Sequence, residues 1–507
     1  MQLKFEVYRN GERLTAFRPV GACAVGPESV PTAGEVSFRD GYLIVETPDD
    51  EPAGVSLLWD TGQPGQYQLE TTRLPPRDRP YNLNLELLRQ RLMKIIQKQE
   101  DWNLFDMPGA DDLLSRCRQV QDIFAEALSR QHDPAAAARL ADEALPLAVD
   151  LSEDLARFHS ELLLNRRRAA NGFVRHIFGC RVDVGLQNQK YRDMLTAHFD
   201  YAVLPTPWKL LQPQETDFDT RLLDTWSDAL ARRRLPIIAG PLVNLDETEI
   251  PDWMFIFEND FDTLRELAYE HVNRLVQKYR RTVNLWNVVG GLCTNRAFHL
   301  SFEQIIELTR LLVSQVKNIL PAARTLVTVS HPFGEYHARN TTSVAPLLYA
   351  EMVAQAGINF DGFAIELELG VPEPGMFMRD LFQLSALLDR FSPLGRPVFI
   401  TAIGSPGRWT PDSSDRSEGR LDPAAAGRWK KPWDPHVQAD WLEAVYNIAL
   451  SKPFVESVAW GNLVDINQTL PGGGLLDDMY QPKPAFERLQ QMRAKIQQWS
   501  GRAQTAK

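Results

Sequence analysis

The stretch Arg396–Pro406, RPVFITAIGSP, decides the fold of this 507-residue chain. Its apolar run, Pro397–Ile400, has the length of a strand, includes β-branched residues, and leads into a turn that contains Gly, Ser and Pro. A continuous apolar run is typical of a parallel strand, because helices cover both faces of such a sheet. The stretch therefore predicts one buried parallel strand of an α/β fold.

Similar apolar segments alternate with helical patterns over residues 172–495. Each candidate strand is followed by residues with helical spacing, for example Ser301–Leu320. Eight such units predict a (β/α)8 TIM barrel, whose active site lies on the loops after the C-terminal ends of the strands. Residues 496–507 are expected to form a tail. The candidate strands are GFVRHIFGCRVDVG, FDYAVLP, LPIIAGPLV, VNLWNVVGG, RTLVTVSHP, FDGFAIELEL, RPVFITAIG and ESVAWGNLVD.

Two further units precede the predicted barrel. Residues 1–108 contain short segments of alternating polar and apolar residues, separated by turns with Gly, Pro and Asp, which predicts a small antiparallel β-sandwich. Residues 109–171 carry apolar residues at helical spacing, so we expect a helical connector there. The complete prediction is an α/β chain with an N-terminal β-sandwich, a helical connector and a (β/α)8 barrel.

Charge and hydropathy exclude several classes of function. A formal net charge of −11 argues against the clustered basic surface that binds nucleic-acid phosphates, so no nucleic-acid partner is expected. No segment approaches the roughly 20 apolar residues of a membrane span, so no membrane association is expected. The N-terminal segment MQLKFEVYRNGERL has no apolar stretch typical of a signal peptide. These features predict a cytoplasmic protein.

Metal and cofactor sites are not indicated. The four cysteines, Cys23, Cys117, Cys180 and Cys293, are far apart in the sequence and form no C-x-x-C motif. The segment His331–His337, HPFGEYH, contains His and Glu without the H-E-x-x-H spacing of a helical zinc site. We therefore expect no metal and no cofactor.

Four segments together carry a resemblance to a known family. Besides Arg396–Pro406, they are His198–Asp219 (HFDYAVLPTPWKLLQPQETDFD), Trp286–Gly291 (WNVVGG) and Gly474–Leu489 (GLLDDMYQPKPAFERL). In this order they are similar to the seventh-strand, second-strand, fourth-strand and C-terminal segments of glycoside hydrolase family 10, the endo-β-1,4-xylanase family. The resemblance covers roughly residues 172–490. It implies a carbohydrate-active barrel whose partner is an oligosaccharide or polysaccharide.

The same resemblance implies that the standard catalytic pair is lost. In the family the fourth strand ends in the acid/base Glu and the seventh in the nucleophilic Glu, and the matching residues here are Gly291 and Ala402. A neighbouring Asn and a pocket His of the family fall on Gly290 and Pro241. Retaining hydrolysis needs two carboxyl groups about 5–5.5 Å apart, which Gly and Ala do not supply. Activity by the usual route is therefore not expected.

Two carboxylates on the sixth predicted strand are the candidate catalytic residues that replace this pair. In the strand Asp361–Leu369, alternation directs Glu366 and Glu368 into the barrel mouth, at positions where the family has a Gln and a His. Two like charges so close should raise one pKa, which suits a general acid. The alternatives are binding of sugar hydroxyls or a cation without catalysis, and structural pairing with Lys209 or an Arg.

Further residues are candidate substrate contacts. Lys209 falls on the family's substrate-binding Lys. Tryptophans near strand ends can stack on sugar rings, although Trp is also a common core residue. Asn287 lies near the lost acid/base, and His331 falls where the family's fifth strand has a polar pocket residue, although a lone His is more often structural. The candidate substrate-binding residues are Lys209, Trp208, Trp286, Asn287, His331 and Trp460.

Three hypotheses on function stay open. The chain is a carbohydrate-binding pseudoenzyme, a glycosidase that uses Glu366 and Glu368, or a non-catalytic scaffold protein. An open cleft with aromatic walls and both Glu side chains exposed favours the first two, whereas a cleft filled by the long loop of residues 404–438 favours the third. The N-terminal sandwich is either a carbohydrate-binding module or a structural cap on the barrel.

Overall fold

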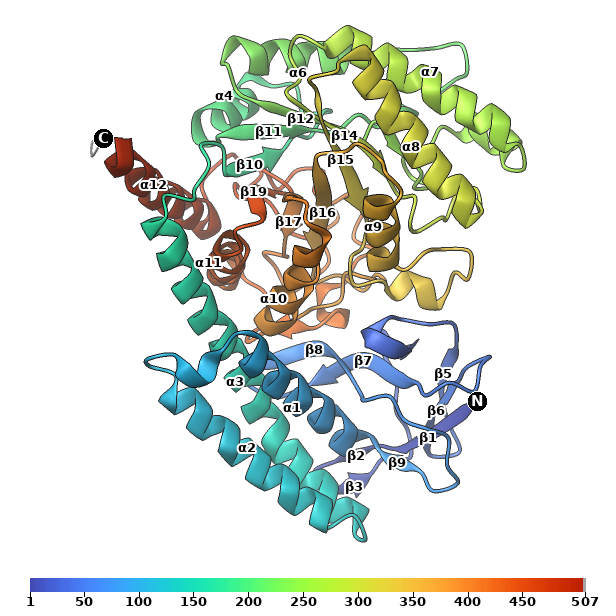
Figure 1. The fold of residues 1–507 in the computed structure, drawn as a ribbon, viewed down its shortest axis with the longest axis vertical. Coiled ribbons are helices and arrows are strands. Elements are labelled where there is room, and N and C mark those ends of the chain that lie inside the picture. Colours follow the sequence, from blue (N-terminus) through green and yellow to red (C-terminus); the bar gives the residue numbers. More distant parts are fainter. Residues whose placement is uncertain (505–507) are drawn as a thin grey trace.

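The computed structural model describes the backbone of residues 1–504 and the side chains of residues 1–499. A part built of strands and helices lies at one end of the molecule, and a barrel surrounded by helices lies at the other (Figure 1). None of the helices in the described residues combines the length and the apolar character that a membrane span requires.

Eight parallel strands form a closed barrel. The last strand pairs with the first, and the third pairs with the fourth, so the sheet has no free edge. The short β13 (Val243–Asn244) adds to the end of the fourth strand. The predicted (β/α)8 barrel is confirmed. Its strands are β10 (Phe178–Arg181), β11 (Tyr201–Leu204), β12 (Ile237–Ala239), β14 (Leu285–Gly290), β15 (Arg324–Val329), β16 (Gly362–Glu368), β17 (Val398–Gly404) and β19 (Val455–Trp460).

Helices follow the barrel strands and cover the outside of the barrel (Figure 1). Helix α8 begins with a capping box, in which Ser301 and Gln304 each accept a backbone hydrogen bond from the other. The predicted tail is helical up to Gln504, and its last residues, 505–507, lie outside the described residues. The barrel helices are α4 (Gln189–His198), α5 (Trp208–Leu211), α6 (Arg221–Arg232), α7 (Phe261–Tyr279), α8 (Phe302–Ile319), α9 (Pro346–Gln355), α10 (Leu381–Asp389), α11 (Pro435–Ser451) and α12 (Pro484–Gln504).

Side chains inside the barrel alternate as the sequence pattern predicts. Phe399 of β17 belongs to a small apolar cluster in the barrel interior, whereas its two neighbours in sequence belong to the main core with the helices. Ala364 of β16 is in the same inner cluster, and Glu366 and Glu368 follow it toward the C-terminal end of the strand. The inner cluster consists of Tyr201, Val203, Ile238, Leu285, Leu326, Ala364, Phe399 and Ala459.

The N-terminal part contains two four-stranded sheets, with strand orders β5-β6-β1-β9 and β18-β8-β7-β4. Strand β18 comes from the loop after β17 of the barrel, so this loop completes an N-terminal sheet. A separate pair, β2 with β3, forms a small hairpin. The strands are β1 (Gln2–Glu6), β2 (Tyr8–Arg9), β3 (Glu12–Arg13), β4 (Cys23–Val25), β5 (Glu35–Arg39), β6 (Tyr42–Glu46), β7 (Gly54–Asp60), β8 (Gly65–Glu70), β9 (Tyr81–Asn82) and β18 (Arg428–Trp429).

Residues 83–101 form a helix within the range 1–108, for which the sequence pattern predicts a small β-sandwich. This is helix α1 (Leu83–Asp101), which begins where the side chain of Asn82 accepts a hydrogen bond from the backbone N–H of Leu85. Its buried apolar residues recur at spacings of three and four, which is the helical period. They include Leu85, Leu88, Leu92 and Ile95.

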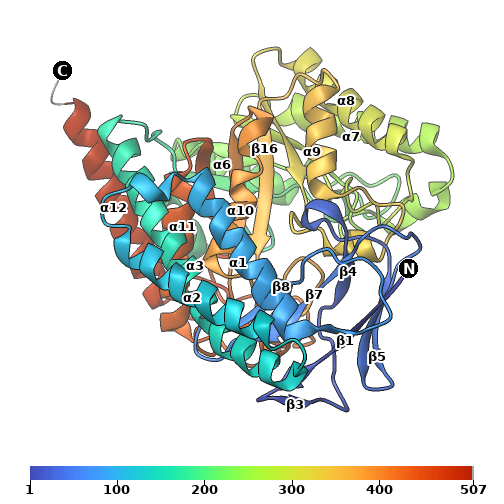
Figure 2. The same ribbon diagram turned by 60° about the horizontal axis from the view of Figure 1, so that its bottom comes forward.

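Helices α2 (Asp111–Ser129) and α3 (Pro134–Ala169) form at the place of the predicted connector. Helix α3 packs against α1 and α2 on one side and against α10 and α11 of the barrel on the other (Figure 2). Buried Glu153 of α3 accepts hydrogen bonds from Trp429 Nε1 at 2.8 Å and from the backbone N–H of Leu381 at 3.2 Å. Polar contacts and one continuous apolar core therefore join the N-terminal part to the barrel.

Candidate functional site

The mouth of the barrel holds a polar cavity of about 390 Å³. Residues of β10, β11, β13, β14, β16 and β17, and of the loops after them, line this cavity, which is where a (β/α)8 barrel places its active site. Within the described part of the chain, the lining contains no aromatic side chain. The polar lining residues are Arg181, Asp183, Thr206, Asn244, Glu249, Asn287, Glu366, Thr401, Arg416, Asn462 and Asn467.

Arg181, the last residue of β10, lies between the two candidate carboxylates. Its Nη2 donates to Glu368 Oε1 at 2.7 Å and to Thr469 Oγ1 at 2.9 Å. Its Nη1 lies 3.9 Å from Glu366 Oε1. The side chain of Glu368 is 9% exposed, and that of Glu366 is 36% exposed. Arg181 therefore compensates the buried charge of Glu368, and Glu366 is the carboxylate that faces the cavity.

Gly461 provides the space for this ion pair. Its carbonyl oxygen accepts a hydrogen bond from Arg181 Nε at 3.1 Å. A Cβ at this position would lie 2.5 Å from Glu368 Oε1, which is closer than atoms approach without a bond. The absence of a side chain at Gly461 thus lets Arg181 and Glu368 meet at the cavity wall.

The environment of Glu366 favours its neutral form. Burial raises the pKa of Glu366 from about 4.5 to about 7. The nearby carboxylates of Glu368 and Glu249 contribute to this rise, and the positive charge of Arg181 opposes it. At neutral pH the Glu366 side chain therefore exists both as an acid that donates a hydrogen bond and as a carboxylate that accepts one.

At the two positions that the resemblance assigns to the catalytic pair, this chain has Gly291 and Ala402. Gly291 has a φ of +70°, a left-handed conformation that side chains disfavour. A Cβ on Gly291 would also lie 2.6 Å from Asn244 Oδ1 and 2.9 Å from the backbone N of Asp246. Ala402 is fully buried in β17. A side chain at position 291 would therefore be strained in this backbone and would require neighbouring atoms to shift.

The three predicted tryptophan contacts are buried in the protein core. Trp208 stacks on His271 with 4.1 Å between the ring centres. Trp460 is fully buried, and its Nε1 donates to the carbonyl oxygen of Gly473 at 2.8 Å. Trp286 is also buried. The rings already have protein neighbours on their faces and edges, so none of the three is presented to a ligand.

Only one of the other predicted contacts lines the cavity, among the residues described. Asn287 of β14 lies in its wall. Lys209 instead forms a surface ion pair with Asp252, with 2.5 Å between Nζ and Oδ1. His331 lies outside the lining and is partly buried. Burial and the nearby positive charge of Arg296 lower the pKa of His331 to about 4, so its ring is neutral at pH 7.

Several lining residues were not singled out from the sequence. Asp183 follows β10, and its Oδ2 accepts from Asn467 Nδ2 at 3.0 Å. Arg416 Nη2 lies 3.9 Å from the same oxygen. Glu249, in the loop after β13, also lines the cavity. Arg181 had a recognisable signal, because it is a charged residue at the C-terminal end of the first predicted strand. Arg416 and Asn467 had no such signal in the sequence, because they lie in long loops whose path to the cavity depends on the tertiary fold.

Two segments of the loop of residues 404–438 contact different parts of the molecule. Arg416 lines one side of the mouth cavity, and its backbone N–H donates to the carbonyl oxygen of Gln468 at 3.0 Å. Further along, Arg428–Trp429 form β18 beside β8 of the N-terminal part. The loop therefore forms a wall of the cavity and an attachment for the N-terminal sheet, and it leaves the cavity unfilled.

Comparison with known proteins gives a likeness of fold. No protein-family model matches the chain, and a search of curated proteins finds no match. Native xylanase 10B from Thermotoga maritima matches with 16% identity over 66% of this chain and 99% of that chain, with a TM-score of 0.47. A GH10 structure from Paenibacillus barcinonensis matches with 16% identity over 65% of this chain and 97% of that chain, with a TM-score of 0.47. An endo-1,4-beta-xylanase from Caldicellulosiruptor owensensis matches with 17% identity over 64% of this chain and 98% of that chain, also with a TM-score of 0.47. At these values the function has to be argued from this chain's own residues.

Proposed function

We propose that the barrel is a carbohydrate-active protein similar to glycoside hydrolase family 10 that binds a β-linked oligosaccharide at its mouth without the standard retaining chemistry. The described lining has no aromatic walls and Glu368 is mostly buried, so the proposal rests on the polar lining of the cavity. Every sugar hydroxyl both donates and accepts hydrogen bonds, so a sugar site needs both kinds of partner. Arg181 and Arg416 donate, Asp183 and Glu249 accept, and the neighbouring Asn side chains do both.

The observation that carries the proposal is the arrangement around Arg181. This arginine bonds Glu368, so Glu366 is left as the accessible carboxylate on β16. Gly291 and Ala402 leave the two standard positions without a carboxyl group. Retaining hydrolysis uses one carboxylate as nucleophile and a second as acid. The cavity also holds Glu249, but it has no carboxyl group at either position that the resemblance assigns to the catalytic pair, so we rank holding a sugar above cleaving it.

A second candidate function is a glycosidase that uses Glu366 as its general acid. One observation favours it, because a carboxyl group with a pKa of about 7 matches the requirement for an acid at neutral pH. In this alternative Glu368 acts as the second carboxylate, and it has to exchange its hydrogen bond to Arg181 for the substrate or a water. We rank this function below binding for that reason.

Calorimetric titration with xylo-oligosaccharides of two to six units tests the proposed binding. We expect binding by the wild type and loss of affinity of about tenfold in Arg416→Gln, because a charge-assisted hydrogen bond at the cavity is removed. Arg118→Gln is the matched control, since Arg118 is exposed on α2 and far from the lining. Absence of binding in the wild type, or equal affinity in Arg416→Gln, contradicts the assignment of this cavity.

A further inference from the structure

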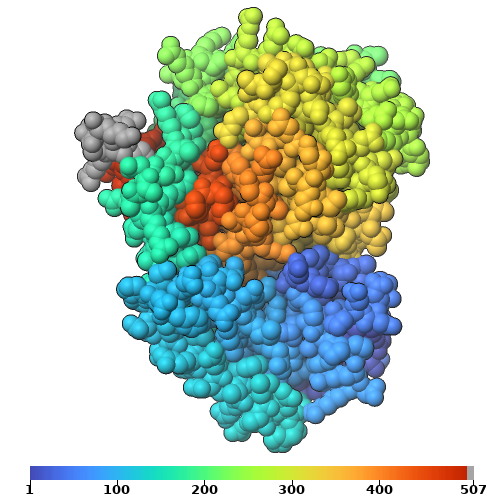
Figure 3. Space-filling model, viewed as in Figure 1, coloured from blue at the N-terminus to red at the C-terminus, as the bar shows by residue number. Residues whose placement is uncertain are grey.

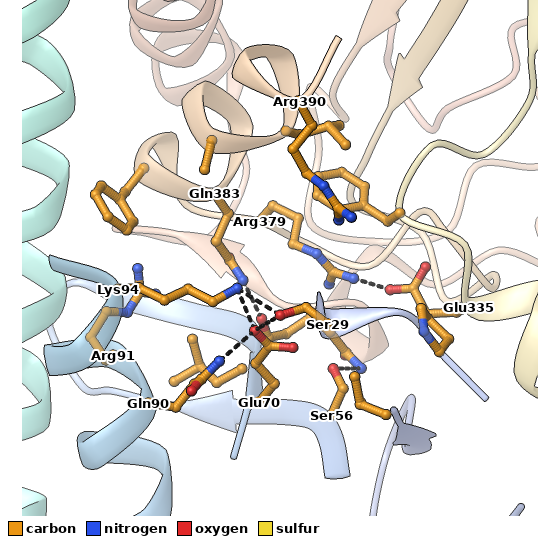
Figure 4. A pocket seen from close by; sticks show the side chains of 18 of the residues that line it. Ser29, Ser56, Glu70, Gln90, Arg91, Lys94, Glu335, Arg379, Gln383 and Arg390 are labelled. Atoms are coloured by element: carbon orange, nitrogen blue, oxygen red, sulfur yellow. Dashed lines mark hydrogen bonds and ion pairs between the residues drawn. The ribbon is translucent and has the colours of Figure 1, made fainter. Parts of the chain in front are cut away.

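A second polar cavity, of about 140 Å³, lies between the N-terminal part and the barrel. One wall comes from β8 and α1, and the other comes from α10 and the residues that follow β15 (Figure 4). In the space-filling view the blue N-terminal part meets the orange and yellow barrel along this boundary (Figure 3). The cavity shares no lining residue with the mouth cavity, so a ligand here is independent of a sugar at the mouth.

Positive charge exceeds negative charge in and beside this cavity. Arg390 at the end of α10 has no ion pair or side-chain hydrogen bond among the described residues. Arg73 is a second cation beside Glu70, with 3.9 Å between Nη1 and Oε2. Among the lining residues, four cations (Arg91, Lys94, Arg379 and Arg390) face two carboxylates (Glu70 and Glu335), which leaves an excess of two positive charges in the lining. The remaining charges form the ion pairs Arg91–Asp380, Arg379–Glu335 and Lys94–Glu70.

Three buried polar atoms of the described lining residues have no hydrogen-bond partner. One is Oε1 of Gln68, and the other two are Nη1 of Arg379 and Oε2 of Glu335, whose residues are 5% and 4% exposed. A buried donor or acceptor that stays unpaired costs free energy, so a molecule that pairs these last two atoms gains binding energy. In Figure 4, Arg379 is turned toward Glu335, to which a dashed line joins it, and Arg390 extends toward this pair from above.

Burial disfavours the charged form of both arginines, although Arg379 already has Glu335 as a partner. Burial lowers the pKa of Arg379 to about 10 and lowers the pKa of Arg390 as well. A bound anion offsets this cost of burial, because its negative charge and hydrogen bonds replace the water that each guanidinium loses on burial.

We propose that this cavity binds a small oxyanion that also carries a hydroxyl group, such as the phosphate ester of a small polyol. The oxyanion accepts hydrogen bonds from Arg379 Nη1 and from Arg390, and the hydroxyl group donates to Glu335 Oε2. The walls belong to both parts of the molecule, so the bound ligand joins the N-terminal part to the barrel.

Calorimetry and thermal unfolding with defined probes test this proposal. The probes are glycerol 3-phosphate, inorganic phosphate and glycerate, each compared with potassium chloride at equal ionic strength. We expect glycerol 3-phosphate to bind, to raise Tm, and to bind more tightly than inorganic phosphate because of its hydroxyl groups. Binding of glycerate in addition identifies a carboxylate as an equally good oxyanion, and its failure to bind identifies the phosphate group as required.

Variants locate the site. Arg390→Gln is expected to weaken glycerol 3-phosphate binding about tenfold or more, whereas Arg390→Lys keeps the charge and retains more of the affinity. Arg118→Gln on exposed α2 is the control and is expected to bind like the wild type. If no probe differs from potassium chloride with the wild-type protein, or if Arg390→Gln binds as tightly as the wild type, the proposal is overturned. Xylo-oligosaccharide binding is expected to be unchanged in Arg390→Gln, so the two sites are tested separately.

Discussion

Glu366 of β16 lies directly opposite Ala402 of β17 in the register of the barrel sheet, just after a β-bulge in this strand pair. Ala402 is the position that the resemblance to family 10 assigns to the nucleophile. A carboxylate therefore reaches the mouth from the neighbouring strand, next to the position where the family's seventh strand presents one. Position 291, which the resemblance assigns to the acid/base, is a glycine, and a side chain there would be strained and crowded. The mouth therefore carries Glu366 and Glu249, but no carboxyl group at the two positions that the resemblance assigns to the catalytic pair.

The first prediction concerns Gly291, with Gly395 as the matched control. Both have a positive φ, +70° and +65°, so alanine at either position costs about 1 kcal/mol for the left-handed conformation. Only at position 291 does the new Cβ meet other atoms, since nothing lies within 4 Å of it at position 395. We expect Gly291→Ala to lower the free energy of unfolding by about 1–3 kcal/mol more than Gly395→Ala, from overpacking. If chemical denaturation gives the same loss in the free energy of unfolding for Gly291→Ala and Gly395→Ala, crowding at position 291 is contradicted.

The second prediction concerns the ion pair of Arg181 and Glu368. Arg181→Met leaves the buried carboxylate of Glu368 without its partner, so we expect a loss of about 3–5 kcal/mol in the free energy of unfolding. The double variant Arg181→Met with Glu368→Gln removes the stranded charge and is expected to recover part of this loss. Arg416→Met, at a half-exposed arginine of the same cavity, is the control and is expected to change stability by no more than about 0.5 kcal/mol. A double variant no more stable than Arg181→Met contradicts the pairing.

The third prediction is a pH dependence caused by Glu366. Its pKa is raised in the folded protein, so folding favours the protonated form, and the stability it contributes is fully present below about pH 4.5 and is lost as the pH rises to about 7. We expect Glu366→Gln, which cannot ionise, to have a higher Tm than the wild type at pH 8. The difference should shrink toward pH 5. Thermal unfolding across this range measures it, and a pH-independent difference shows that the pKa of Glu366 is not raised.

The fourth prediction concerns the attachment of the loop of residues 404–438. Glu153→Leu leaves Trp429 Nε1 and the backbone N–H of Leu381 without their acceptor, so we expect a loss of about 1–3 kcal/mol in stability. Glu153→Gln keeps a carbonyl oxygen as acceptor and is expected to be tolerated. Trp429→Phe removes the hydrogen-bond donor. In this background, Glu153→Leu should therefore lower the free energy of unfolding by less than it does in the wild type. Equal effects of the Gln and Leu variants speak against this hydrogen bond as a stabilising contact.

The barrel could be predicted from the sequence because its signals are local. The apolar run before Thr401 and the alternation through Phe363 and Ala364 each follow from the geometry of one strand. Helix α1 was missed because residues 83–101 follow a region of short strands, although Asn82 and the spacing of the leucines mark a helix. The contribution of β18 to an N-terminal sheet has no local signal, because it joins segments more than 350 residues apart.

The candidate site was predictable only in part. The inward direction of Glu366 follows from strand alternation, but the pairing of Glu368 with Arg181 depends on a side chain that reaches across the barrel. Tryptophans near strand ends are equally compatible with a sugar platform and with a core, and Trp286 and Trp460 proved to be core residues. The sequence pattern gives the direction of a side chain, whereas its neighbours depend on the tertiary fold.

Native mass spectrometry of the protein with xylohexaose, recorded after prolonged incubation, tests the central claim most directly, because one spectrum shows both binding and the integrity of the ligand. We predict a complex with the mass of intact xylohexaose, for the wild type and for Glu366→Gln at higher ligand concentration. Shorter sugars produced by the wild type and not by Glu366→Gln would contradict the account and establish a glycosidase that acts through Glu366.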